Sequence, residues 1–354
     1  MLSQSSMQQA ELESTPGSAL RKGAAIRTRP IEVRWDPSKS VFAKPEFLQA
    51  VGDEYGWLGG FDDSDTLRCI LPYTVVRKAG LRLVRFRVET MSTGPSLDVA
   101  EEQLFLNGVV RFLRAKGTDA IIPASNNAIF RTYPTGAKAA PYGTYAIDLT
   151  QPEETLWRNI SKTSRQNITA AQKDGVTVRE AGESLDSAYD LIVDTFRRSK
   201  MGFMSREAFK RFAHSLGENC KILAAEHNGI AQSYSLFAFS EPSAFWVYGG
   251  NIANQHSGAM KLLQWEAIRI FRNLGVRNYD FYGARIDPPP GSKQEGINKM
   301  KKHLGANLVQ GYMWKYSIRP GRSWLYTKAV KVLRGGDLVD QEEHKLQNSS
   351  AVGV

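Results

Sequence analysis

The sequence has few of the residues that cross-link a chain or hold a metal. Only two of its 354 residues are cysteines, Cys69 and Cys220, and both stand beside apolar residues without metal or redox spacing. This predicts reduced, buried thiols in a cytoplasmic protein. No apolar run approaches about 18 residues, so no membrane-spanning helix is expected. Residues 1–29 lack the apolar segment of a signal peptide.

The common catalytic signatures are also missing. The sequence contains no P-loop, no Gly-x-Gly-x-x-Gly, no nucleophile elbow and no His-Glu-x-x-His, and its five histidines show no ligand spacing. These absences argue against phosphoryl transfer, covalent serine or cysteine catalysis and metal hydrolysis, and no metal site is expected. They leave reactions that are driven mainly by positioning and electrostatics.

What the sequence has in excess is positive charge. Lys and Arg number 46 against 36 Asp and Glu, which gives a net charge of +10. This excess favours a polyanionic partner, either nucleic acid, an anionic membrane surface or a phosphate-bearing substrate. A basic protein that is merely soluble remains the alternative.

Strand-like runs alternate with amphipathic helices, which predicts an α/β (α+β) fold. The polar ends, residues 1–28 and 335–354, are predicted to be disordered. Strands are predicted at residues 31–35, 68–73, 83–88, 120–123, 144–149, 221–226, 231–239 and 244–249. Helices are predicted at residues 97–115, 152–160, 185–199, 206–216 and 258–273, the second of them with Thr150 as its cap and Glu153 three residues on.

The two longest predicted helices end in the same pattern. Three anchor residues recur at a displacement of 158: Arg111 and Arg269, Arg114 and Arg272, Gly117 and Gly275. A strand with an aspartate near its start follows each helix, Asp119 in one case and Asp280 in the other. Chance is the alternative, but the shared spacing favours a duplication. We therefore predict a first lobe at residues 29–143 and a second at 144–334, with the site in the cleft between them.

Four segments of the second half resemble the Fem-type aminoacyltransferases, which build peptidoglycan cross-bridges. They occur in the family's order. The first is Leu-Trp followed by the basic Lys-Thr-Ser-Arg-Gln-Asn-Ile helix and Gly-Val, at 156–176. The second is Trp-Val-Tyr-Gly-Gly at 246–250, and the third is Tyr-Asp-Phe-Tyr-Gly at 279–283. The fourth is Gly-Ile-Asn-Lys-Met-Lys-Lys-His-Leu-Gly at 296–305, in which Met300 and Leu304 replace two phenylalanines.

The resemblance implies two lobes that are each related to the GNAT acetyltransferase fold, without the coiled-coil arm of some members. It implies transfer of an aminoacyl group from aminoacyl-tRNA to an amine of a phosphate-bearing cell-wall precursor, with no bound cofactor. Relatives with the same doubled fold that use acyl-CoA leave an alternative, an N-acyltransferase acting on a sugar or amino-acid amine. A basic RNA- or membrane-binding module is the non-enzyme alternative.

The resemblance also implies roles for individual residues of the site. Lys301 matches the family's motif lysine, which faces substrate phosphate or developing negative charge, although a solvated lysine is the alternative. Arg206 resembles the arginine that holds precursor phosphate, in a segment where Phe209 lacks the family's hydroxyl; a surface salt bridge is its alternative. Lys162 and Arg165 are candidates for binding phosphate or tRNA, or they form the solvated face of a basic helix.

Other candidates follow from the residues themselves. Tyr248 and Tyr282 end predicted strands near the cleft, where they would orient the amine or sugar, or serve as core aromatics. Asp280 is a candidate proton acceptor or a structural turn residue. Gln255 and Gly258 fit the first half of the GNAT pyrophosphate cradle at a helix N-terminus, which Met260 then breaks. A plain helix start is the alternative at that position.

The basic, amphipathic segment 322–334 would rest on the anionic inner leaflet or pack on its own domain. We expect a monomeric enzyme. The amino acid that is moved, the acceptor amine and the choice between tRNA and CoA stay open at this point.

Overall fold

The first half of the chain forms an antiparallel meander with one long helix. The computed structural model describes residues 26–351. The strands of this half are β1 (Arg27–Ile31), β2 (Glu54–Phe61), β3 (Leu67–Lys78), β4 (Leu81–Phe86), β5 (Met91–Ser92) and β6 (Ala120–Ile121). Its helices are η1 (Val41–Ala43), α1 (Pro45–Val51) and α2 (Val99–Ala115). Helix α2 begins at a capping box formed by Asp98 and Glu101, which satisfies two helix-end N–H groups.

The second half repeats this order and adds helices. Its strands are β7 (Lys138–Asp148), β8 (Thr177–Glu180), β9 (Cys220–His227), β10 (Ile230–Phe239), β11 (Ser243–Asn251), β12 (Asn278–Asp280) and β13 (Asn307–Ser317). Its helices are α3 (Glu153–Asn159), α4 (Lys162–Lys173), η2 (Gly182–Ser184), α5 (Leu185–Arg198), α6 (Arg206–Leu216), η3 (Gly217–Asn219), α7 (Ala259–Asn273), α8 (Lys293–His303), α9 (Pro320–Arg334) and α10 (Leu338–Ala351).

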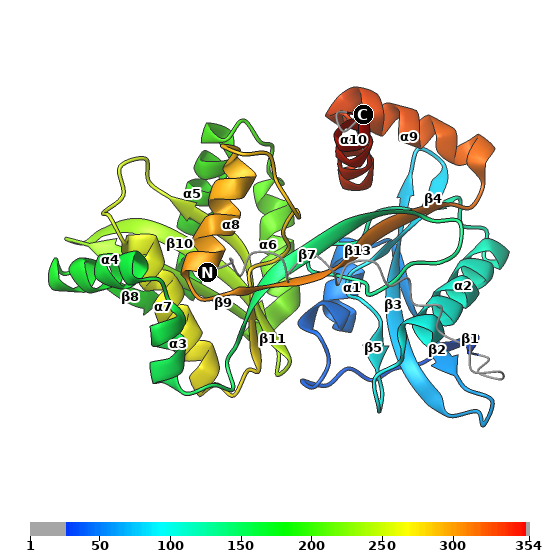
Figure 1. Cartoon of the computed structure of the whole chain (residues 1–354), viewed down its shortest axis with the longest axis horizontal. Helices are drawn as coiled ribbons and strands as arrows, with labels where there is room; N and C mark the ends of the chain where they lie inside the picture. Colours follow the sequence, from blue (N-terminus) through cyan, green and yellow to red (C-terminus); the bar gives the residue numbers. More distant parts are fainter. Residues whose placement is uncertain (1–25, 352–354) are drawn as a thin grey trace, which may run out of the picture.

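The two lobes exchange their last strands. Strand β7 follows β6 in the chain but pairs with β12, whereas β13 follows β12 and pairs with β6. Between them, β7 and β13 pair with each other from Ala146 opposite Asn307 to Lys138 opposite Lys315. One sheet therefore runs through both lobes, and the two long strands cross from one lobe to the other in Figure 1.

The repeat predicted from the helix ends is present in the strand pairing. Helix α2 joins β4 to the parallel strand β6, and α7 joins β11 to the parallel strand β12. Gly117 and Gly275 follow these helices with φ of 79° and 77°, a left-handed conformation that glycine adopts without steric cost.

The two aspartates, in contrast, are not counterparts. The N–H of Asp119 donates to the carbonyl of Arg82, and the equivalent bond in the second lobe is made by Arg277 to Glu241. A displacement of 158 likewise leads from 119 to 277. The interpretation of Asp280 as the repeat of Asp119 is therefore wrong, and its role has to be read from its own contacts.

The ends of the chain and one helix cap differ from expectation. Residues 338–351, which lie in the predicted C-terminal tail, form helix α10. Residues 27 and 28, the last two of the predicted N-terminal tail, belong to β1. Residues 1–25 and 352–354 lie outside the described chain. Thr150 does not cap α3, because its hydroxyl donates to Asp148 Oδ1 at 2.7 Å and Pro152 takes the cap position. The predicted lobe boundary at 143/144 falls inside β7.

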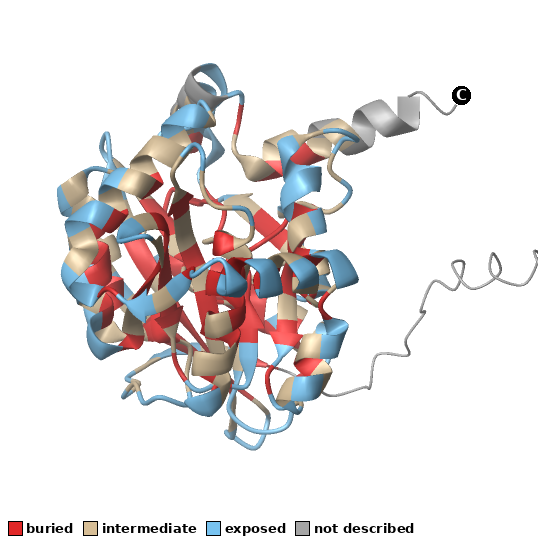
Figure 2. Ribbon diagram, turned by 90° about the vertical axis from the view of Figure 1, so that its left-hand side faces the viewer, coloured by how far each residue is buried: buried red, intermediate tan, exposed pale blue. Residues whose placement is uncertain are grey.

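A shared apolar core holds the lobes together. Phe42, which precedes α1, packs on Phe245 of β11 with ring centroids 5.0 Å apart, and Phe47 of α1 packs on Phe212 of α6 at 5.5 Å. All four rings are buried. Figure 2 shows the buried strands between helices whose outer faces are exposed. Because this contact is apolar and continuous, it fixes the relative position of the two lobes.

Candidate active site at the junction of the lobes

A tight turn after β12 forms the centre of the candidate site. It begins at Asp280, and the next two residues after Phe281 have left-handed backbone, with φ of 57° at Tyr282 and 86° at Gly283. Positive φ is uncommon for a bulky residue and costs free energy, so the surroundings must hold the turn in place. Such strained backbone is concentrated at functional sites.

Asp280 holds this turn from inside. Its Oδ1 accepts hydrogen bonds from the Thr144 hydroxyl at 2.7 Å and from the N–H of Tyr282 at 2.6 Å. The Thr144 hydroxyl in turn accepts the N–H of Gly283 at 3.0 Å. Burial raises the pKa of Asp280 to about 6, while these two hydrogen bonds and the charge of Lys301 oppose the rise. The carboxyl group therefore changes protonation state close to neutral pH.

Lys301 of α8 holds the same turn from the other side. Its Nζ donates to the carbonyl oxygens of Phe281 at 3.0 Å and Gly283 at 2.7 Å, and the residue is only 5% exposed. Burial lowers the pKa of this ammonium to about 8, while Asp280 raises it. An ammonium has three N–H donors, and two are used here. The third has no acceptor among residues 26–351.

The turn lies directly against residues of the first half of the chain. A Cβ added to Gly283 would come 2.6 Å from the Asn126 carbonyl oxygen and 2.5 Å from the Tyr142 hydroxyl oxygen. Glycine is thus required here by close approach as well as by φ. The contact places Lys301 and Asp280 at the junction of the lobes.

Of the two predicted site tyrosines, Tyr282 belongs to this turn and Tyr248 lies on β11. Tyr282 packs against Phe42 with ring centroids 5.8 Å apart, and Tyr248 of β11 packs edge-on against Phe203 at 5.0 Å. Burial raises the pKa of Tyr248 to about 12 and that of Tyr282 further, while the charge of Arg87 opposes both shifts. Both hydroxyls are therefore neutral donors at physiological pH.

Arg206 lies away from this group. It begins α6, and its guanidinium forms ion pairs with Asp186 at 2.9 Å and with Asp190, both on α5. It also lies over the Tyr189 ring, with Cζ 4.5 Å from the centroid. These contacts fit the surface salt-bridge interpretation, and the phosphate-binding role stays a prediction.

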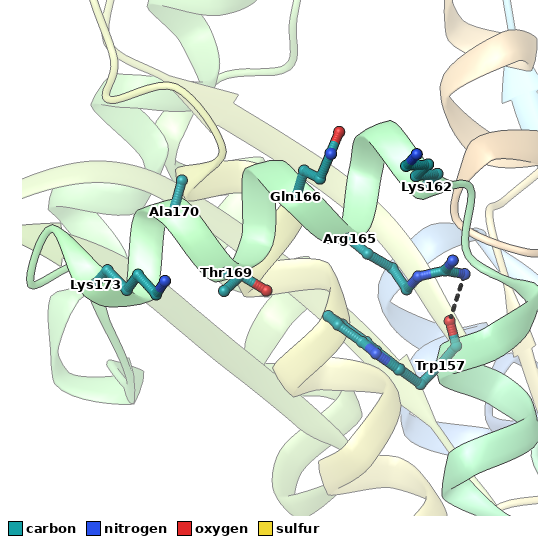
Figure 3. A pocket seen from close by; sticks show the side chains of 7 residues that line it. All are labelled: Trp157, Lys162, Arg165, Gln166, Thr169, Ala170 and Lys173. Atoms are coloured by element: carbon teal, nitrogen blue, oxygen red, sulfur yellow. Dashed lines mark hydrogen bonds between the residues drawn. The ribbon is translucent and has the colours of Figure 1, made fainter.

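Lys162 and Arg165 line a separate, outward-facing cavity of about 480 Å³ on α4 (Figure 3). Arg165 points back to α3, where it donates to the carbonyls of Arg158 at 2.8 Å and of Ile160. Arg165 thus donates hydrogen bonds to carbonyl groups that are left unpaired at the C-terminal end of α3. Lys162 is exposed and is the more accessible of the two to a phosphate.

The segment predicted to cradle a pyrophosphate is packed beneath α4. Gly258 caps α7 with φ of 94°, and a Cβ there would lie 2.4 Å from the Asn167 carbonyl oxygen. His256 contacts Asp174 through Nε2 at 3.1 Å, while Gln255 Oε1 is buried without a hydrogen-bond partner in the described chain. The glycine therefore gives α4 room to approach α7, and a phosphate would need another entry to this helix end.

A second cavity of about 490 Å³ lies between the lobes, and sequence reasoning missed its acidic residue, Glu89. The charged wall residues of this cavity are Lys39 and Glu89, the second of which follows β4. The local sequence Arg85-Phe-Arg-Val-Glu89 alternates charged and apolar residues, as in any strand with one solvated face. Nothing in that pattern indicates that the glutamate faces the other lobe.

Residues 26–351 contain no cluster of His, Cys, Asp or Glu that would hold a metal ion. Within the same residues, no helix has the length and apolar character needed to cross a membrane.

Comparison with known proteins defines the class first. The crystal structure of FemX superposes on 84% of this chain and 99% of its own with a TM-score of 0.65, at 13% sequence identity. A conserved protein of unknown function from Bacteroides thetaiotaomicron VPI-5482 superposes on 78% of this chain and 91% of its own, with a TM-score of 0.50 at 9% identity. The predicted α/β fold class is confirmed, and the two-lobed chain shares the fold of FemX.

The sequence comparison finds similarity to one family over part of the chain. The FemAB family model matches residues 130–235. Aminoacyltransferase FemA of Staphylococcus aureus (strain MW2) is 28% identical over 95 residues, which are 26% of this chain and 23% of that relative. The predicted resemblance to the Fem-type family is thus confirmed over this part of the chain. The aligned segment spans about a quarter of the length of this relative.

Proposed function

We propose that the protein is an N-acyltransferase that moves an aminoacyl group from aminoacyl-tRNA to an amine of a peptidoglycan precursor. The observation that carries this proposal is the buried Lys301–Asp280 pair on a strained turn, where the two lobes of a Fem-type fold meet. Its activity is proposed from the family and from FemA, which is named as an aminoacyltransferase.

The reaction needs three contributions that this turn supplies. A neutral amine attacks the ester carbonyl, the new C–N bond forms, and the ester oxygen leaves as a hydroxyl that takes up the proton lost by the amine. Asp280, with its pKa near 6, suits the proton transfer. The free N–H of Lys301 suits the oxyanion, and Tyr248 and Tyr282 would orient the substrates as neutral donors. No covalent enzyme intermediate is required.

A tRNA donor is favoured over acyl-CoA by two observations. Gly258 of the candidate cradle packs closely under α4, where a Cβ would lie 2.4 Å from the Asn167 carbonyl oxygen, whereas Lys162 and Lys173 are exposed on α4. The net charge of +10 suits a polyanionic donor. We include Lys162 and Arg206 as candidate contacts to tRNA or precursor phosphate, and no bound cofactor is required.

The acceptor and its location belong to the same proposal. A cell-wall precursor with phosphate groups is made on the inner side of the membrane, so we propose a monomeric cytoplasmic protein in peripheral contact with the inner leaflet. Helix α9 supports that contact, because Trp324 and Val332 are 56% and 77% exposed. On its other side the helix is held by Arg322, which pairs with Asp119 at 3.1 Å.

The test is a transfer assay with the purified full-length chain. Radiolabelled aminoacyl-tRNA and labelled acetyl-CoA are each incubated with nucleotide-linked and lipid-linked precursors that carry a free amine. We expect product with charged tRNA, loss of product in Lys301→Met, and full activity in Lys299→Ala, a matched change at an exposed lysine of the same helix. Product with acetyl-CoA alone would overturn the donor assignment.

A further inference from the structure

The sheet of the first lobe bulges where it faces the second lobe. Strands β3 and β4 pair up to Tyr73 opposite Phe86, and β3 then pairs with β5 at Ile70 opposite Met91. Four residues, 87–90, therefore stand opposite only two, 71–72. Bulges re-aim side chains and occur frequently next to active sites. This one contains Glu89.

Glu89 forms part of the wall of the inter-lobe cavity of about 490 Å³. This volume lies in the range of small-ligand pockets. Both lobes contribute to it, and its remaining lining is mostly small and neutral, with Ile70, Ser92, Thr93, Ser243 and Phe245 among its residues.

The carboxylate of Glu89 has no cationic partner in the described chain, residues 26–351. Lys39, the lysine of the cavity wall, forms an ion pair with Asp36 instead. Two further carboxyl groups, Asp280 across the lobe junction and Glu102 of α2, act on Glu89 by like-charge repulsion. Burial, assisted by this repulsion, raises the pKa of Glu89 to about 7. Glu89 is only partly buried, but a negative charge there is still costly without a cationic partner, and a cationic ligand would supply one.

We propose that Glu89 and the cavity around it bind the primary ammonium group of the acceptor amine. This inference rests on the proposed transfer function and identifies the acceptor subsite within it. An ammonium is small enough for the cavity, supplies the missing charge, and donates hydrogen bonds to the carboxylate. Phe245, which lines the cavity, packs against Tyr282 of the turn held by Lys301 with ring centroids 6.5 Å apart, so the cavity lies next to that turn. Glu89 is thus a binding and positioning residue, and Asp280 remains the candidate base.

The inference is tested by direct binding, which requires no donor. Cadaverine, a simple diamine, is titrated into the full chain at pH 8 by calorimetry, with 1,5-pentanediol as the uncharged probe. We expect the wild type to bind the diamine and not the diol, and the isosteric Glu89→Gln to bind the diamine at least about tenfold more weakly. Glu46→Gln, which alters an exposed glutamate of the same lobe, should bind as the wild type does.

A second measurement does not depend on a variant. Ammonium binding requires ionised Glu89, so diamine affinity in the wild type should rise as the pH increases from 6 to 8. The carboxyl groups whose charges act on Glu89 are Asp280 and Glu102, and Asp280, with its pKa near 6, contributes mainly to the lower part of this range. Lys39, the other charged residue of the cavity wall, stays paired with Asp36. Flat affinity across this range, or unchanged binding in Glu89→Gln, overturns the inference.

The transfer assay separates this inference from the proposed function. A Glu89→Gln enzyme that transfers aminoacyl groups with a raised KM for the acceptor and a nearly unchanged kcat supports both. Transfer with an unchanged KM overturns the ammonium site alone. Diamine binding that depends on Glu89, in a protein without any transfer activity, overturns the proposed function and supports the site.

Discussion

Replacing Lys301 by Met tests whether the buried ammonium serves function rather than stability. Burial lowers the pKa of this lysine from 10.5 to about 8, which corresponds to about 3 kcal/mol against the charged form. Its two hydrogen bonds to the carbonyls of Phe281 and Gly283 are charge-assisted and contribute about 2 kcal/mol each. Lys301→Met loses about 4 kcal/mol of hydrogen bonding but also removes the burial cost of about 3 kcal/mol. We therefore expect the substitution to lower the free energy of unfolding by only about 1 kcal/mol.

Activity should respond quite differently. The variant has no N–H donor for the developing oxyanion, and loss of one such donor lowers kcat by about 100- to 1000-fold. Transfer from charged tRNA to the precursor amine gives kcat, and urea unfolding gives the free energy. A variant that keeps more than about a tenth of the activity would show that the ammonium does not act on the reacting groups.

The pH dependence of stability provides the sharper check. Between pH 8 and 10.5 the unfolded chain holds a proton on Lys301 that the folded chain has lost, so this group makes stability rise with pH. From pH 8 to pH 10 the gain is about 2 kcal/mol. We expect the difference in unfolding free energy between wild type and Lys301→Met to change by this amount. A constant difference would refute the burial argument.

Three further substitutions test the surrounding structure. Gly283→Ala should lower the free energy of unfolding by at least about 3 kcal/mol in urea titrations, against about 1 kcal/mol for Gly291→Ala, because both have positive φ and only the first meets atoms within 4 Å. Arg165→Gln should cost about 1–2 kcal/mol by the same assay through the lost helix cap, whereas Lys162→Gln should cost less than about 0.5 kcal/mol and weaken tRNA binding in filter assays. Trp324→Ala should weaken binding to anionic vesicles about tenfold in sedimentation, and unchanged sedimentation would exclude α9 as the contact.

Local patterns in the sequence predicted much of the secondary structure. The predicted helices at 97–115 and 206–216 agree with α2 and α6 to within two residues, because each has a strong apolar stripe with a cap residue before it. Thr150 shows where such patterns fail: the capping-box spacing is present, but the neighbouring carboxylate of Asp148 takes its hydroxyl. Short-range competition between acceptors is invisible in the spacing of residue types.

The exchange of β7 and β13 could not be predicted, since duplication alone fits two separate sheets equally well. The candidate site was predicted in part, because Lys301 of α8 hydrogen-bonds the turn that the motif at 279–283 forms. Glu89 was missed because the orientation of its side chain is set by a bulge, and a bulge depends on pairing with a strand that is distant in sequence.

The unequal chemistry of two similar lobes explains why this fold has one candidate centre. The displacement of 158 that relates β6 to β12 makes Ile122 the counterpart of Asp280. Ile122 is apolar and only 6% exposed. The first lobe therefore has no counterpart of the reactive turn. Conversely, β11, the counterpart of β4, carries no carboxylate that would correspond to Glu89. One lobe thus supplies the lysine–aspartate turn and the other supplies the negative charge for an ammonium. Because neither set is complete alone, the shared apolar contact between the lobes is a requirement of the reaction as well as of stability.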